Sequence, residues 1–157
     1  MIRRPDSRLS LLFDLFAANQ QVRTLLGHAL ANSGLSADEY AVYSILFDEG
    51  PHAPSELARR AGMPPTTMTH YVRSMLERGH VERAPSSSDR RSYRLVLTAA
   101  GILAHGRASR AFDEAHRRFI GALTVDEVEA GTVLRAVGRA AAVAEHRLTA
   151  DSVDATA

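Results

Sequence analysis

The chain has 157 residues, enough for one domain with a sizeable core, and its formal net charge of +1 is not that of a strongly basic protein. It contains no cysteine, which excludes disulfides, thiolate metal sites and thiol redox switches. No apolar run is long enough to cross a bilayer, and the first residues lack the apolar segment of a secretory signal. We therefore expect a cytoplasmic protein with no membrane partner.

Residues 7–33 are predicted to form the first helix. Its first half carries an unusual number of large apolar side chains: Leu9, Leu11, Leu12, Phe13, Leu15 and Phe16. These residues cover more than one helical face, whereas a terminal helix on a small monomer needs only one apolar stripe. The surplus favours burial of this helix against a second chain.

A helix that opens with a capping box is predicted next, followed by two short helices joined by a turn. Ser36 and Glu39 have the spacing of a capping box, which opens a helix that ends at Gly50-Pro51. Beyond it, residues 55–61 are predicted to form a helix that stops at Gly62, with Pro54 suited to its first turn. A second helix, residues 65–78, stops at Gly79 in the same way.

The helix over residues 65–78 has two distinct faces. Its apolar side chains recur at helical spacing on one face: Met68, Val72, Met75 and Leu76. Polar side chains point away from that face: Thr66, Thr67, His70, Arg73 and Glu77. Hydroxyls and a guanidinium suit the edges of bases in a DNA major groove, although an ordinary solvated helix face has the same pattern.

A hairpin follows, with strands predicted at residues 81–84 and 92–97. Its connecting loop contains Asp89, Arg90 and Arg91. Adjacent arginines in such a loop suit a narrow minor groove, and Asp89 is placed to orient Arg91. Between Ser55 and Arg94 there are eight arginines and four acidic residues, so this segment has a net charge of +4 in a nearly neutral chain. Positive charge is thus concentrated where phosphate would be bound.

The remaining sequence is predicted to be helical. Thr98 can cap a long helix that ends near Leu123, and Thr124 with Glu127 has the spacing of a second capping box for a helix ending near residue 148. Residues 149–157 are small, polar or acidic and are predicted to form a disordered tail. The first helix and the last two lie outside the helix-turn-helix, so we expect them to form a dimerisation region.

Four short motifs together resemble the MarR family of bacterial transcription regulators. They are Leu76-Glu77-Arg78-Gly79, Val81-Glu82-Arg83, Asp89-Arg90-Arg91 and Leu97-Thr98. The resemblance implies a mainly α fold with a small β-hairpin wing. It predicts one domain over residues 1–157, with a winged helix-turn-helix DNA-binding lobe at 36–98 and a helical dimerisation region at 7–33 and 99–148.

The resemblance also implies a function. It predicts a homodimeric regulator, a repressor, that binds double-stranded DNA at a palindromic operator, with two recognition helices about 10 base pairs apart. Residue-by-residue transfer assigns DNA contacts to Thr66, Thr67, Thr69, His70, Arg73, Asp89, Arg90 and Arg91. A small aromatic or phenolic ligand would relieve repression. His28, Tyr40 and Tyr43 are candidates for its site, although core or interface roles explain these residues equally well.

Three other functions compete with this interpretation: a metal-responsive regulator, an enzyme and a protein-binding module. A metal-responsive regulator of the same fold needs converging ligands, yet none of the seven histidines forms an i, i+4 pair with another, so no metal site and no cofactor are predicted. No nucleophile elbow, phosphate-binding loop or metal motif indicates an enzyme. A winged-helix module that binds protein instead of DNA would be expected to lack the wing arginines, and Arg90 and Arg91 are present.

Overall fold

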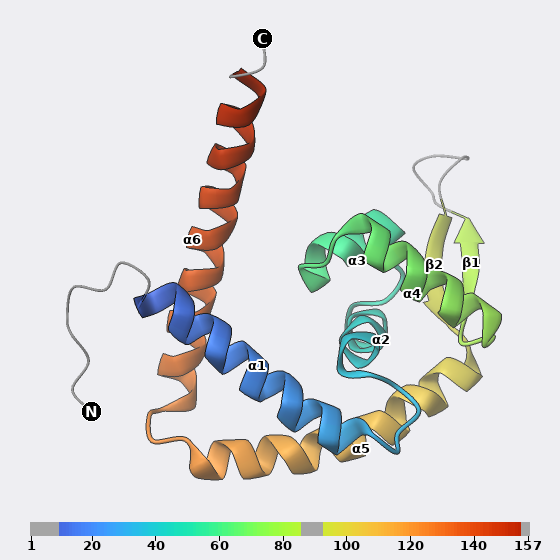
Figure 1. Ribbon diagram of the computed structural model, residues 1–157. Helices are drawn as coiled ribbons and strands as arrows, with labels where there is room; N and C mark the ends of the chain where they lie inside the picture. Colours follow the sequence, from blue (N-terminus) through green and yellow to red (C-terminus); the bar gives the residue numbers. More distant parts are fainter. Residues whose placement is uncertain (1–9, 86–92, 155–157) are drawn as a thin grey trace. The chain divides into compact units, whose positions relative to one another are not determined.

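The computed structural model describes residues 10–85 and 93–154, with side chains to Asp151, and is mainly helical (Figure 1). Its elements are α1 (Ser10–Leu30), α2 (Ala37–Glu49), α3 (Pro54–Ala61), α4 (Pro65–Glu77), β1 (Val81–Pro85), β2 (Tyr93–Leu97), α5 (Ala99–Ala122) and α6 (Glu127–Asp154). The strands form one antiparallel hairpin. The predicted fold class, mainly α with a β-hairpin wing, is confirmed.

The chain divides into two compact units, and the boundary lies inside α5. The first unit comprises Met1–His116 and the second comprises Arg117–Ala157. The second unit consists of the last turns of α5 followed by α6. Every functional residue predicted from the sequence belongs to the first unit.

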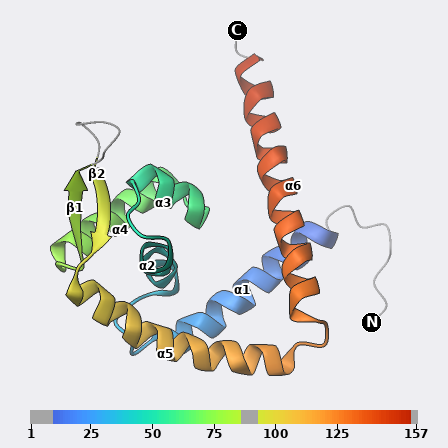
Figure 2. The same cartoon turned by 180° about the vertical axis from the view of Figure 1, so that it is seen from behind.

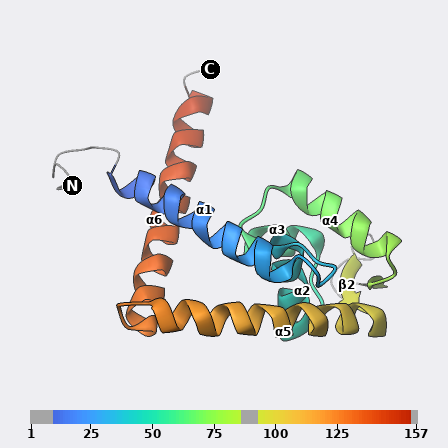
Figure 3. The same ribbon diagram turned by 60° about the horizontal axis from the view of Figure 1, so that its bottom comes forward.

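The core of the first unit is built around α2. Figures 1 and 3 show α2 between α4 and α5, and Figure 2 shows it beside α3 and the hairpin. The largest fully buried side chains come from α2, α3, α4 and β2: Val42, Tyr43, Leu57, Met68, Met75 and Leu95. These elements therefore share one apolar core, which supports both the helix-turn-helix and the hairpin.

The start and end of α2 follow local sequence signals. The Ser36 hydroxyl accepts a hydrogen bond from the Glu39 N–H at 3.2 Å, and the Glu39 carboxylate accepts one from the Ser36 N–H at 2.9 Å. This reciprocal pair is the predicted capping box. The helix ends before Gly50, whose φ of 81° lies in the region that favours glycine.

The hairpin pairs Val81 with Leu97 and Pro85 with Tyr93. On the other side of β2, His52 exchanges two backbone hydrogen bonds with Leu95, at 3.4 and 2.8 Å. The segment between α2 and α3 thus adds a single bridge to the edge of the hairpin. This pairing could not be predicted from sequence patterns, because it joins residues 43 positions apart and involves one residue of an otherwise irregular segment.

The start of α5 is fixed against the turn after α4. The Thr98 hydroxyl donates to the Gly79 carbonyl at 2.7 Å and accepts from the Gly101 N–H at 3.2 Å, while the Thr98 N–H donates to the His80 carbonyl at 3.0 Å. A Cβ at position 101 would overlap that same carbonyl oxygen. The sequence needs glycine here because the two backbones approach so closely.

Two predictions for the C-terminal region are wrong. The helix α6 is capped by Asp126, whose carboxylate accepts from the N–H groups of Val128 and Glu129 at 2.9 and 3.0 Å, and not by a box opening at Thr124. The predicted disordered tail at 149–157 is helical as far as Asp154. Thr149 fits inside the helix because its hydroxyl donates to the carbonyls of Glu145 and His146.

A matched pair of glycine substitutions in α5 tests the close approach at its start. We expect Gly101→Ala to lower the free energy of unfolding by about 1–3 kcal/mol, because the added methyl group meets backbone that cannot move aside easily. Gly106→Ala, in the same helix with nothing within 4 Å, should raise it by about 0.5–1 kcal/mol. Urea unfolding followed by circular dichroism measures both, and similar effects of the two substitutions would contradict the account.

Candidate nucleic-acid interface

The helix-turn-helix consists of α3, a three-residue turn and α4. Gly62 ends α3 in the left-handed conformation at φ 63°, and its N–H donates to the Arg59 carbonyl at 3.3 Å. The Met63 N–H then donates to the Ala58 carbonyl at 2.9 Å. Pro65 starts α4 at a position where a missing N–H costs nothing. The turn is therefore set by glycine and proline chemistry within a few residues.

The two faces of α4 are as the sequence predicts. Met68, Val72 and Met75 are buried at spacings of four and three residues. The opposite side exposes Thr66, Thr69, His70, Arg73 and Glu77, whereas Thr67 is half-buried. The Thr69 hydroxyl donates to the Pro65 carbonyl at 2.9 Å, which leaves its lone pairs as acceptors. We call the exposed residues Thr66, His70 and Arg73 the reading face.

The predicted wing residues Asp89, Arg90 and Arg91 lie outside the described residues. The base of the hairpin is described, and it carries two further arginines. Arg94 donates to the Pro51 carbonyl at 3.0 Å and lies 3.6 Å from the Glu56 carboxylate. Arg83 lies over the ring of Tyr93, with its guanidinium carbon 4.6 Å from the ring centroid. Arg94 is thus held by α3 and the preceding segment, while Arg83 faces Tyr93.

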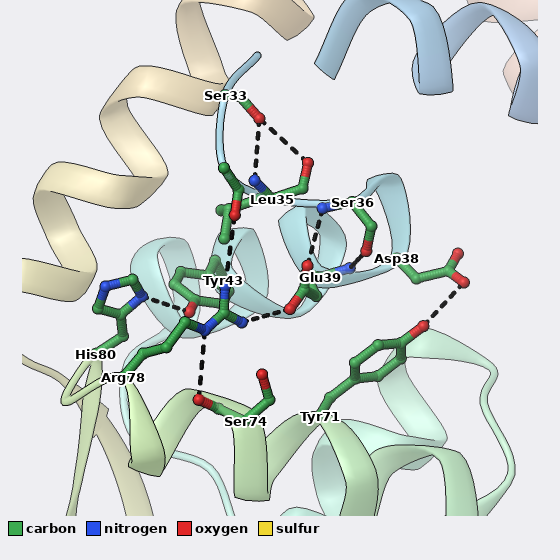
Figure 4. Close-up of polar contacts among 11 residues, drawn as sticks. Ser33, Leu35, Ser36, Asp38, Glu39, Tyr43, Tyr71, Ser74, Arg78 and His80 are labelled. Atoms are coloured by element: carbon green, nitrogen blue, oxygen red, sulfur yellow. Dashed lines mark hydrogen bonds and ion pairs between the residues drawn. The ribbon is translucent and has the colours of Figure 1, made fainter. Parts of the chain in front are cut away.

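The end of α4 is held by an ion pair with the first turn of α2 (Figure 4). Arg78, which follows the last residue of α4, donates to the Glu39 carboxylate and to the Gly34 carbonyl, the latter at 3.4 Å. Burial alone would raise the pKa of Glu39, but the Ser36 N–H and the Arg78 guanidinium outweigh it and lower that pKa below its ordinary value. Glu39 is therefore ionised at neutral pH and joins α2, α4 and the α1–α2 loop.

The middle of α4 is held by the neighbouring carboxylate of α2. The Tyr71 hydroxyl donates to Asp38 at 3.1 Å, as Figure 4 shows. Asp38 also accepts two hydrogen bonds from the Arg23 guanidinium of α1, at 3.2 and 3.3 Å. Partial burial and then the charge of Asp38 raise the pKa of Tyr71, so its proton stays in place as the donor. One carboxylate thus connects α1 with the reading helix α4.

A third contact lies beneath the turn between α4 and β1. The hydroxyl of the fully buried Tyr43 lies 2.8 Å from Nδ1 of His80. Burial raises the pKa of Tyr43 to about 12, and burial followed by the charges of Arg78 and Arg107 lowers the pKa of His80. Since the imidazole is then neutral at pH 7, Nδ1 can accept a hydrogen bond from the Tyr43 hydroxyl. Tyr43 accordingly fixes the start of the hairpin.

The three residues predicted to line a ligand crevice are dispersed. His28 is exposed on α1, and Tyr43 is buried in the core. Tyr40 stacks on His105 at 5.3 Å between ring centroids and donates to Ser109 at 3.5 Å. A cavity of about 410 Å³ lies instead between the end of α1 and the start of α2, and none of the three lines it. The ligand-binding role of these residues stays a prediction.

Sequence reasoning missed the residues that position α4. Glu39 was identified only as a capping residue, and Arg78 only as part of a motif, while Arg23, Asp38 and Tyr71 carried no signal of their own. Each pairing joins residues that are 15 to 39 positions apart. A list of charged and phenolic residues on facing sides of predicted helices would have contained these pairs among many others.

In residues 10–85 and 93–154, no group of three His, Asp or Glu side chains is placed to hold a metal ion. Over that same portion, none of the helices combines the length and apolar character that a bilayer span requires.

The helix-turn-helix and hairpin resemble those of known transcription regulators. Residues 35–93 match the model of the MarR family. The HTH-type transcriptional repressor YetL of Bacillus subtilis (strain 168) is 30% identical over 95 residues, which are 59% of this chain and 57% of YetL, so the chain spans little more than half of that relative.

Solved structures agree with this match. A probable transcriptional regulator from Pseudomonas aeruginosa has a TM-score of 0.70 and 27% identity, covering 85% of this chain and 98% of the other. The regulator MOSR of M. tuberculosis, solved in complex with DNA, has a TM-score of 0.74 at 24% identity, covering 85% and 97%, and shares the fold. The predicted family resemblance and the winged helix-turn-helix are confirmed.

Two arginine substitutions of the same kind test how α4 is held. Arg78→Met should lower the free energy of unfolding by about 1–3 kcal/mol, because it leaves the partly buried Glu39 carboxylate without its charged donor. Arg60→Met removes an ion pair with Glu49 that is open to solvent and should change stability little. Urea unfolding at pH 7 measures both, and equal losses would contradict a special role for Arg78.

Proposed function

We propose that this chain, a member of the MarR family, is a DNA-binding transcription regulator that acts as a homodimer on a palindromic operator. The exposed reading face of α4 is the observation that carries this proposal, because Met68, Val72 and Met75 bury the apolar side in the core while the polar side is open to solvent. YetL is a repressor by name and MOSR was solved with DNA, which supports repression by occupancy of an operator.

The reading face has the chemistry that base recognition requires. Arg73 can donate two parallel hydrogen bonds to O6 and N7 of a guanine, and Thr66 can bond a base edge or a phosphate. His70 lies between them on the same face, and as a shorter side chain it reaches less far into a groove than arginine. Arg90 and Arg91 are proposed to enter the flanking minor groove, with Asp89 orienting Arg91.

The homodimer is proposed from exposed apolar surface on α1. Four large side chains in its first two turns are well exposed in the single chain: Leu11 at 61%, Leu12 at 68%, Phe13 at 58% and Phe16 at 60%. Monomeric proteins rarely expose so many large apolar side chains together. A second copy of the chain is the partner that also explains a palindromic operator, because two-fold symmetry in the protein matches two-fold symmetry in the site.

A small aromatic acid is proposed as the effector that relieves repression. The cavity between α1 and α2 has a volume of about 410 Å³ and is lined by both members of the Arg23–Asp38 ion pair. A ligand carboxylate bound to Arg23 would compete with Asp38, which also accepts the hydrogen bond from Tyr71 of α4. Binding there would remove the ion pair that orients the Asp38 carboxylate toward Tyr71.

Selection from a random pool of duplexes tests the DNA-binding proposal. We expect recovered sequences to contain inverted half-sites about 10 base pairs apart, and Arg73→Ala to weaken binding about tenfold or more through loss of a bidentate base contact. Arg110→Ala, which removes an exposed arginine of α5, is the control and should bind like the wild type. Adding benzoate should reduce recovery. A selection without a common sequence would contradict the proposal.

Light scattering tests the dimer. The wild type should have twice the chain mass of 17.1 kDa, and the double variant Phe13→Glu/Phe16→Glu should be monomeric because it places charge in the proposed interface. Gln21→Glu/His28→Glu adds two carboxylates to another face of α1, beyond its first two turns, and should remain dimeric. A dimer that survives the phenylalanine substitutions would rule out this interface.

A further inference from the structure

We propose that the groove between α4 and the base of the hairpin binds the sugar-phosphate strand of DNA, with Arg83 as a phosphate contact. This inference rests on the proposed function. The groove has a volume of about 280 Å³ and lies next to the reading face, since Arg73 contributes to both. The rest of its wall includes Thr69 and Glu77 of α4, Arg83 of β1 and Tyr93 of β2.

The position of the groove determines what would occupy it. A winged helix-turn-helix inserts one helix into the major groove and its wing into the neighbouring minor groove. These two grooves of a duplex are separated by one sugar-phosphate strand. That strand must therefore cross between α4 and the hairpin, where the groove lies. A phosphate on it would be within reach of Arg73 on one side and Arg83 on the other.

The strand register directs Arg83 toward this groove. Arg83 pairs with Leu95 across the hairpin, and Val81 pairs with Leu97. Directly opposite residues lie on the same face of a hairpin, and Val81 and Leu95 are both buried on it. Arg83 thus projects from the face of the hairpin that packs on the helices, yet remains exposed because it lies near the outer end.

The ring of Tyr93 orients the guanidinium. The Arg83 guanidinium carbon lies 4.6 Å from the ring centroid, within the range of a cation–π contact. Such stacking leaves the N–H groups at the edge of the guanidinium free to donate to phosphate oxygens. It also restricts the side chain before DNA arrives, which reduces the entropy lost on binding.

Among the described residues of this groove wall, Glu77 is the one with an acidic side chain, and it makes the proposal more specific. Its carboxylate would lie close to the bound phosphate and oppose it. The described part of the wall then has two positive charges and one negative charge. Removing the negative charge should strengthen binding, whereas removing either positive charge should weaken it, and a purely structural role for Arg83 predicts no such opposite effects.

Salt-dependent DNA binding tests the proposal. The probes are a duplex recovered by selection and an unrelated duplex of the same length, each labelled for fluorescence anisotropy and titrated at several salt concentrations. Arg83→Gln should weaken binding to both duplexes by a similar factor, on the order of tenfold, and reduce the slope of log K against log salt by about 1 per protomer. Glu77→Gln should strengthen binding to both.

Two further variants serve as controls. Arg94→Gln makes the same charge change in the adjacent strand, where the side chain is paired with Glu56, and should leave the salt slope unchanged. Arg83→Lys keeps the charge without the planar group and should keep most of the slope. Melting curves followed by circular dichroism establish that each variant is folded.

Each outcome decides between the two proposals. A wild-type chain that binds neither duplex overturns the proposed function and this inference with it. A wild type that binds while Arg83→Gln keeps the full salt slope overturns only the phosphate contact. Equal losses of slope in Arg83→Gln and Arg94→Gln would show a general charge effect and would also overturn it.

Discussion

Two adjacent carboxylates in the first turn of α2 determine where α4 lies. Asp38 accepts from Tyr71 in the middle of α4, and Glu39 accepts from Arg78 at its end. The apolar side of α4 contributes most of the burial, but hydrophobic contact has no direction and tolerates small rotations and shifts. Two polar contacts about two helical turns apart remove that freedom, because both must be satisfied at once.

The same carboxylates connect α4 with the rest of the first unit. Asp38 binds Arg23 of α1, and Arg78 also donates to the carbonyl of Gly34 in the α1–α2 loop. On the other side, Tyr43 and His80 fix the turn from α4 into the hairpin. The reading face and the base of the hairpin are therefore positioned from one internal element, α2.

Local signals in the sequence predicted much of this fold, whereas pairings between residues far apart in the chain could not be predicted from it. The Ser36–Glu39 capping box and the helix ends at Gly62 and Gly79 depend only on neighbouring residues. Their spacing in the sequence is therefore enough to identify them. The Arg78–Glu39 pair joins residues 39 positions apart and depends on how helices pack. Local reasoning also failed where two caps competed, since Asp126 lies two residues after Thr124 and is itself a strong cap. The sequence predicted the candidate site as one face of α4. It did not predict the contacts that hold α4 in place.

A crystal structure of the chain with a selected duplex tests most directly whether the exposed face of α4 binds DNA. We expect α4 of each protomer to lie in a major groove, with Arg73 at base edges and one sugar-phosphate strand crossing between α4 and the hairpin. A duplex bound along another surface, with the reading face of α4 turned to solvent, would contradict it.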